Sequence, residues 1–254
     1  MKKYLQASGL LPTTAAALKG VFDRGQPLLQ LGLVITNAIA VSSLPALINQ
    51  QKKQSNQIVR WKVQQLFQLA LLFAFAAAIG LTVLMPQINW VLFGSTQGSF
   101  ALAVNSLTIP LATIIILDNV LLQIEEQQVA AFKVILLIII GKIFFNWLLI
   151  TPYGINGAAW GSVLSLLVGM IAAGRLEKNV GFSYLRTAGW FRKLLITMSV
   201  MGISVKITAL LIQNQVSFSR LGSFWVLLAA IPIGIIAFFA CTLRFQLLDQ
   251  KFLN

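Results

Sequence analysis

One long apolar run follows another along this chain, and short polar connections separate them. An α-helix rises 1.5 Å per residue, so about 20 apolar residues cross a hydrocarbon core about 30 Å thick. Backbone polar groups find no hydrogen-bond partner in lipid, so such a run must be helical. About seven runs meet this requirement, at 28–48, 66–85, 100–122, 129–150, 155–174, 194–212 and 223–243. We therefore predict an all-α, polytopic membrane helix bundle of about seven transmembrane helices.

The charge balance is strongly basic, with 19 Lys and Arg against 6 Asp and Glu and a net charge of +13. In a soluble protein this excess would suggest a nucleic-acid partner. Only 10% of the residues are charged, however, whereas soluble domains carry about 25%. The bases also gather in the short connections, a pattern that sets membrane topology and contacts anionic headgroups. We predict membrane lipids as partners and no nucleic acid.

The distribution of the bases predicts an orientation. Bases gather in the first and fifth connections and in the tail, while the connections at 86–99 and 151–156 hold no charge. The connection at 123–128 holds Glu125 and Glu126 and no base, but acids count little in setting topology. The basic residues are Lys52, Lys53, Arg60 and Lys62 in the first connection, Arg175, Lys178, Arg186, Arg192 and Lys193 in the fifth, and Arg244 and Lys251 in the tail. By the positive-inside rule, these connections and the C-terminus face the cytoplasm of a plasma-membrane protein.

The N-terminal segment does not fit this topology by itself. An odd number of spans places it outside the cell, yet residues 1–26 carry four bases and no secretory signal. The sequence therefore predicts a fragment of a truncated or split gene, with a span missing upstream. The organisation expected is an extracytoplasmic lead-in at 1–27, five spans of one bundle at 28–174, a basic cytoplasmic loop at 175–193, and two extra spans with a tail at 194–254.

Several ionisable residues lie within or beside the spans. Lys142 lies about thirteen residues into the fourth span, with Asn146 one turn further on, and a charge at the bilayer centre costs about 2.5–3.5 kcal/mol. Lys142 is thus expected to face a wet cavity rather than to reach the headgroups. Arg24 either anchors at headgroup level, paired with Asp23, or faces the cavity and grips phosphate through its planar guanidinium. Asp118, near the end of the third span, is expected to be a structural partner or an interfacial charge.

Catalytic chemistry has few candidate groups in this sequence. The chain holds no His and a lone Cys241, and no span holds two acids. Hydrolases and transferases that act on lipids need paired acids, His, or a metal held by acids. We predict that the protein is not an enzyme and has no metal site and no cofactor.

Two motifs resemble a known family. FDRGQPLLQLG at 22–32, closing in LPALI at 44–48, resembles the eighth span of MurJ/SpoVB-like polysaccharide flippases, members of the multidrug/oligosaccharidyl-lipid/polysaccharide exporter superfamily. KIFFNWLLI at 142–150, followed by YGINGAA at 153–159, resembles their junction of the eleventh and twelfth spans. The resemblance covers nearly the whole chain as spans eight to fourteen. It implies the C-terminal half of a MATE-like exporter fold, with the first seven spans absent.

The resemblance also implies a function. The family flips undecaprenyl-diphosphate-linked saccharides (polysaccharide repeat units or lipid II) by alternating access, and its Asp-Arg motif places a cavity-facing arginine at Arg24. Substrate binding is expected at Arg24, Lys142 and Asn146, with Asp23 and Asp118 as ion-coupling or pairing acids. A separate chain is expected to supply the N-terminal half. The alternatives are a cation-coupled multidrug-type exporter, with Asp118 as its coupling acid, and an inactive membrane scaffold.

Overall fold

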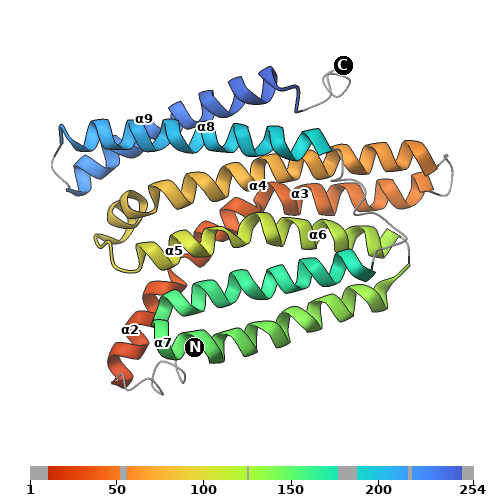
Figure 1. Cartoon of the computed structure of the whole chain (residues 1–254), viewed down its shortest axis with the longest axis horizontal. Coiled ribbons are helices and arrows are strands. Elements are labelled where there is room, and N and C mark those ends of the chain that lie inside the picture. The colour runs from red at the N-terminus through yellow and green to blue at the C-terminus, as the bar shows by residue number, and fades with distance from the viewer. Residues whose placement is uncertain (1–10, 52–55, 125, 177–187, 217–218, 248–254) are drawn as a thin grey trace.

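The computed structural model describes residues 11–51, 56–124, 126–176, 188–216 and 219–247, and these are helical apart from short connections. The helices are α2 (Pro12–Asp23), α3 (Gln26–Gln51), α4 (Asn56–Phe93), α5 (Ser99–Ser106), α6 (Thr108–Ile124), α7 (Gln128–Leu176), α8 (Ala188–Gln213) and α9 (Arg220–Arg244) (Figure 1). No strand occurs in the described ranges. The prediction of an all-α bundle is confirmed.

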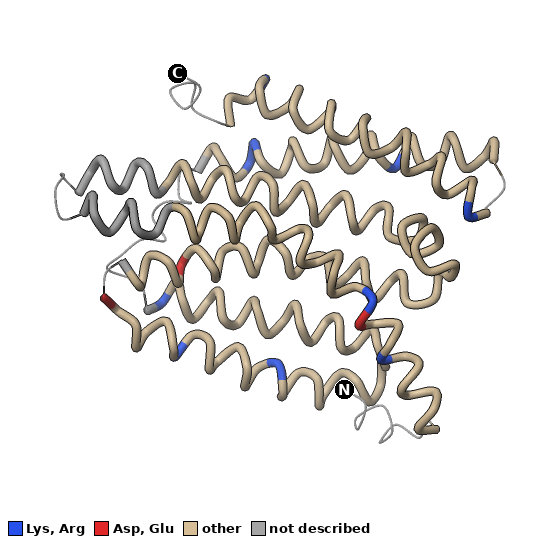
Figure 2. Tube along the Cα trace, turned by 180° about the vertical axis from the view of Figure 1, so that it is seen from behind, with Lys and Arg blue, Asp and Glu red and all other residues tan. Residues whose placement is uncertain are grey.

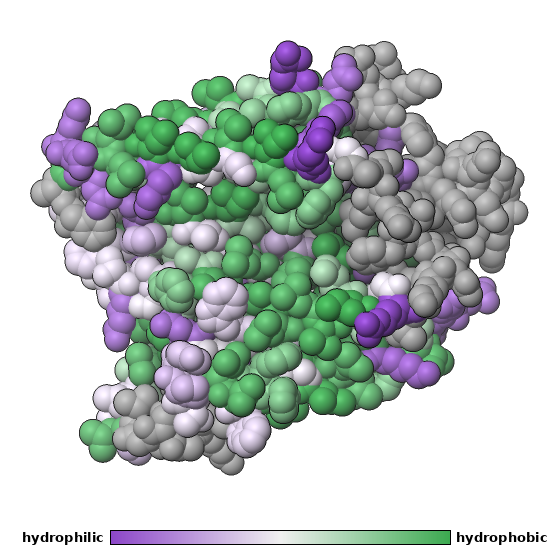
Figure 3. Space-filling view, viewed as in Figure 1, coloured by the Kyte–Doolittle hydropathy of each residue, from purple (hydrophilic) through white to green (hydrophobic). Residues whose placement is uncertain are grey.

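The helices lie side by side with their long axes roughly aligned (Figure 1). The α8–α9 hairpin forms one edge, α3 and α4 follow, then α5 and α6, and α7 forms the other edge. The span of α5 and α6 is the most buried, at 67%, and that of α7 the least, at 11%. Hydrophobic residues cover the middle of the face in Figure 3, and hydrophilic residues gather toward its ends. In Figure 2, the described Lys and Arg likewise lie singly and mostly near helix ends. This is the surface of a protein surrounded by lipid.

The number of membrane crossings depends on α7. Six described helices are long and apolar enough to cross a membrane, whereas the sequence predicts about seven spans. The difference arises because α7 reverses direction at Gly154, where φ is +58° and ψ is −131°. A side chain disfavours this backbone conformation, so glycine is suited to it. The predicted spans at 129–150 and 155–174 are the two arms of this hairpin.

The two arms of α7 approach each other through glycines of the second arm. A Cβ atom at Gly157 would collide with the backbone carbonyl of Leu149, and one at Gly161 would lie 2.8 Å from Oδ1 of Asn146. Backbones can come this close only where small residues line the contact. The close approach of the two arms therefore depends above all on glycine at position 157, where the neighbouring atoms are backbone.

The third predicted span, at 100–122, is divided into α5 and α6 at Leu107. Pro110 lies three residues further on and has no N–H to continue the helical hydrogen-bond ladder. Polar side chains satisfy carbonyls at the break: Ser106 Oγ donates to the Leu102 carbonyl at 3.0 Å, and Thr108 Oγ1 donates to the Asn105 carbonyl at 2.6 Å. The break is thus stabilised from within the bundle, as membrane-buried backbone requires.

A buried hydrogen bond joins α3 to α6 and gives a test of the packing. The hydroxyls of Thr36 and Thr113, 1% and 0% exposed, lie 2.9 Å apart. Replacing either residue alone by Val leaves the other hydroxyl buried without this partner, which should cost about 1 kcal/mol or more. Replacing both should cost less than the sum of the single changes. Thermal unfolding of the four proteins in mild detergent measures this cycle, and strictly additive losses would contradict it.

Candidate functional site

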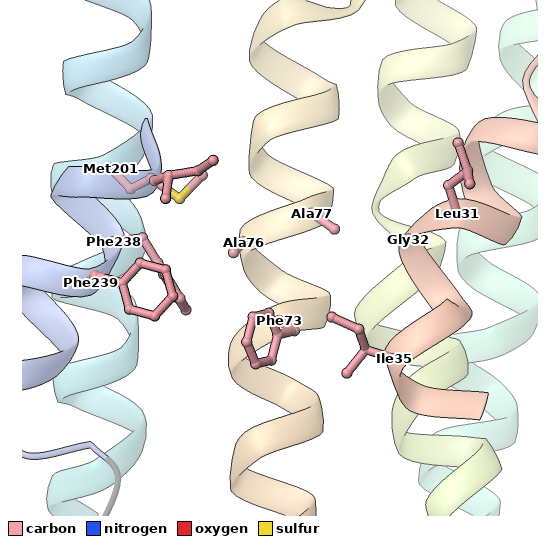
Figure 4. Close-up of a pocket in the computed structure, with 10 residues that line it drawn as sticks. Leu31, Gly32, Ile35, Phe73, Ala76, Ala77, Met201, Phe238 and Phe239 are labelled. Atoms are coloured by element: carbon pink, nitrogen blue, oxygen red, sulfur yellow. The ribbon is translucent and has the colours of Figure 1, made fainter. Parts of the chain in front are cut away.

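An apolar groove of about 350 Å³ runs between α3 and the α8–α9 hairpin, and α4 forms its floor (Figure 4). Its lining residues are all apolar: Leu31, Gly32 and Ile35 from α3, Phe73, Ala76 and Ala77 from α4, Met201 from α8, and Ile235, Phe238 and Phe239 from α9. In Figure 4, Ala77 points toward α3 and Phe238 lies on the opposite wall. The lining offers hydrocarbon contact and no side-chain hydrogen bond.

The groove exists because α4 separates α3 from the hairpin and carries small residues between them. Ala76 and Ala77 project only a methyl group each, which leaves open space above α4 between α3 and the hairpin. Phe73 and Phe238, whose ring centroids are 5.9 Å apart, pack together on the side of the hairpin. This groove was not predicted from the sequence, although the run of alanines at 76–78 indicates a helix face with small side chains.

Arg24 lies at the turn between α2 and α3, half-buried, at the end of the bundle where α4 finishes. Its guanidinium carbon lies 5.1 Å from the ring centroid of Phe93, the last residue of α4. This cation–π contact fixes the arginine against the bundle. Among the described contacts, the carboxylate of Asp23 does not pair with Arg24. It forms an exposed ion pair with Lys19 at 2.8 Å instead.

Arg24 and the groove share α3. Leu31 and Ile35 follow Arg24 by seven and eleven residues, or about 10 and 16 Å along a helix axis. Arg24 itself does not line the groove. The arrangement is a cation at one end of a helix and an apolar channel beginning about 10 Å further along it.

Lys142 and Asn146 lie on the first arm of α7, at the far edge of the bundle from the groove. Lys142 is exposed, whereas Asn146 turns inward, with its Oδ1 buried against the Gly161 backbone of the second arm. Among the described contacts nothing brings Arg24 and Lys142 together. The three residues predicted to bind substrate therefore occupy different places in this half of the fold.

Asp118 lies in the interior of α6 and is 3% exposed. Its neighbours in sequence, Leu117 and Val120, belong to a core that also contains Ala40 and Phe67. Asp118 therefore lies away from the groove lining and from Arg24. Within the described ranges, no group of three or more His, Cys, Asp or Glu side chains could hold a metal ion.

The long apolar helices define a multi-pass helical membrane protein. The structure resembles that of the lipid II flippase MurJ in an inward closed conformation, with a TM-score of 0.65 and 15% sequence identity over 87% of this chain and 47% of that one. The sequence is 29% identical over 267 residues to the "uncharacterized membrane protein YabM" of Bacillus subtilis, covering 98% of this chain and 47% of that protein. No family model matches.

These similarities confirm the predicted resemblance to MurJ-like proteins at the level of the fold. They also show that this chain spans about half the length of each protein that it matches.

Proposed function

We propose that the protein takes part in flipping an undecaprenyl-diphosphate-linked saccharide across the plasma membrane by alternating access, with its C-terminus in the cytoplasm. The observation that supports this most is the apolar groove that begins about 10 Å along α3 from the half-buried Arg24. A polyprenyl diphosphate is complementary to this arrangement, because its anionic head matches the cation and its long hydrocarbon chain matches the apolar groove. The flippase fold supports a lipid cargo independently.

In this proposal Arg24 binds the diphosphate and the groove holds part of the prenyl chain. A guanidinium can donate two parallel hydrogen bonds to phosphate oxygens, and its stacking on Phe93 orients it in advance. Aliphatic and aromatic walls give the chain contact without polar groups to desolvate. Lys142, exposed near the middle of an apolar arm, adds a second positive charge that needs a wet surrounding.

A second polypeptide segment, in this chain's parent protein or in a separate chain, supplies the remaining spans in this proposal. Alternating access requires two bundles that rock against each other, and the chain spans only 47% of each matched protein. Helices α3 to α7 then form most of one bundle, and α8 and α9 form the hairpin that closes the groove. A multidrug-type exporter coupled through Asp118 is less well supported, because that carboxylate is buried away from the groove.

Filling the groove should weaken lipid binding. Replacing Ala77 by Phe puts a ring into the groove, and binding of undecaprenyl diphosphate in nanodiscs should fall at least about tenfold, since each buried methylene contributes about 0.8 kcal/mol. The matched control is Ala240→Phe on the exposed face of α9, which should bind as the wild type does. Equal affinities for the wild type and Ala77→Phe would refute the groove as the chain's binding site.

A further inference from the structure

The outward face of α3 carries a stripe of three carboxamides, formed by Gln26, Gln30 and Asn37. At 100° per residue these side chains fall within about 40° of one another around the helix. All three are exposed in the structure. Asn37 lies eleven residues beyond Gln26, so the carboxamide stripe is about 16 Å long and reaches the middle of a transmembrane helix.

The carboxamide stripe cannot face hydrocarbon without a large cost. An amide without a hydrogen-bond partner in an apolar medium costs roughly 2–7 kcal/mol, and Asn37 is too short to reach the headgroups. No described residue covers the stripe, since its three side chains are exposed. Each matched protein is about twice as long as this chain, so further protein is available to form an opposite wall. The stripe therefore faces either water between two walls or the other wall directly.

The packed face of the same helix distinguishes these two arrangements. The packed face of α3 includes small residues at its closest contacts: Gly32 lies against Ile109, and Ala40 is buried. Close packing of membrane helices uses such small residues. The carboxamide stripe instead bears two long, flexible glutamines. This composition suits a wet space better than a tight contact between helices.

The carboxamide stripe and the groove lie on different sides of α3. Leu31 and Ile35 are about 100–140° around the helix from Gln30. Both features begin near Arg24 and run in the same direction along the axis. Helix α3 thus has a cation at its start, the groove on one side and the carboxamide stripe on another.

We propose that the carboxamide stripe binds the saccharide of the lipid-linked substrate; this inference rests on the proposed function. A carboxamide offers two donors and an acceptor, which match sugar hydroxyls and acetamido groups. The carboxamide stripe carries no charge, and a neutral sugar can be bound by uncharged hydrogen-bonding groups. In this arrangement Arg24 holds the diphosphate, the groove holds the prenyl chain, and Gln30 and Asn37 hold the sugars on the wet side.

The test compares two ligands that differ only in the headgroup. The protein is extracted from source cells in native-lipid nanodiscs, with any further polypeptide of its assembly, and its binding of undecaprenyl diphosphate and of lipid II is measured. The wild type should bind lipid II about tenfold more tightly, because the saccharide adds hydrogen bonds. The double variant Gln30→Leu, Asn37→Leu should lose this preference and keep its affinity for undecaprenyl diphosphate.

Val34→Leu on the same exposed face is the matched control and should retain the preference. Unchanged preference in the double variant would overturn the inference, and so would an equal loss for both ligands. Loss of a co-purifying polypeptide from the double variant would also overturn it, because the stripe would then be a protein contact. If the wild type binds neither ligand, the proposed function fails instead.

Discussion

Replacing Arg24 by alanine is expected to lower the rate of lipid-linked saccharide translocation about ten- to a hundredfold. A hydrogen bond to a charged group contributes about 1.5–3 kcal/mol, and each 1.4 kcal/mol is a factor of ten. The variant also removes the cation that stacks on Phe93. The measurement is translocation of a fluorescent lipid-linked saccharide in proteoliposomes that hold the complete assembly.

Two variants separate the role of Arg24 from general effects of charge. Arg24→Lys keeps the positive charge but loses the planar fork, so it should recover part of the rate. Lys19→Ala removes a nearby cation that pairs with the exposed carboxylate of Asp23, and exposed pairs contribute little. Lys19→Ala should therefore transport as the wild type does. Normal transport by Arg24→Ala would show that the phosphate is bound elsewhere, or that the chain is a scaffold.

Replacing Gly157 by alanine is expected to destabilise the protein by about 3 kcal/mol or more. The added methyl group would meet the carbonyl oxygen of Leu149 across the α7 hairpin, and backbone cannot move aside as a flexible side chain can. The arms would have to separate, which also disturbs Asn146 and Gly161 further along the contact. The measurement is the midpoint of thermal unfolding in mild detergent, together with the yield of folded protein.

Gly20→Ala is the matched control for this prediction. Gly20 lies within α2, and a Cβ atom there would meet nothing within 4 Å. Alanine is the better helix former by about 1 kcal/mol, so Gly20→Ala should be neutral or slightly stabilising. If Gly157→Ala unfolds at the same temperature as Gly20→Ala, the close approach of the two arms is not essential to the fold.

The positions of the helices could be predicted from sequence because a long apolar run that crosses lipid must form an α-helix. The predicted span 28–48 lies within α3, and 223–243 lies within α9. The structure of α7 shows the limit of this reasoning. Apolar length predicts the number of crossings, but it does not reveal how tightly the two arms are joined at Gly154.

Less of the candidate site could be predicted from sequence, because the site depends on which faces of different helices meet. Arg24 was predicted from sequence to bind substrate, but nothing in the sequence indicated its contact with Phe93, which lies about seventy residues away. The groove combines residues from four helices, none of which is unusual alone. Lys142 and Asn146 were both predicted to bind substrate and lie one turn apart, yet the Lys142 side chain is exposed and the Asn146 side chain turns into the hairpin.

The central claim is that α3 holds a polyprenyl diphosphate, with its head at Arg24 and its chain in the groove. Photo-crosslinking with an undecaprenyl diphosphate that carries a photoreactive group in its prenyl chain tests this most directly. Peptide mapping should find the label on α4 around 73–77 and on α9 around 235–239, and Ala77→Phe should abolish it. Label confined to the exposed first arm of α7 and the outer face of α9, unchanged in that variant, would contradict the account.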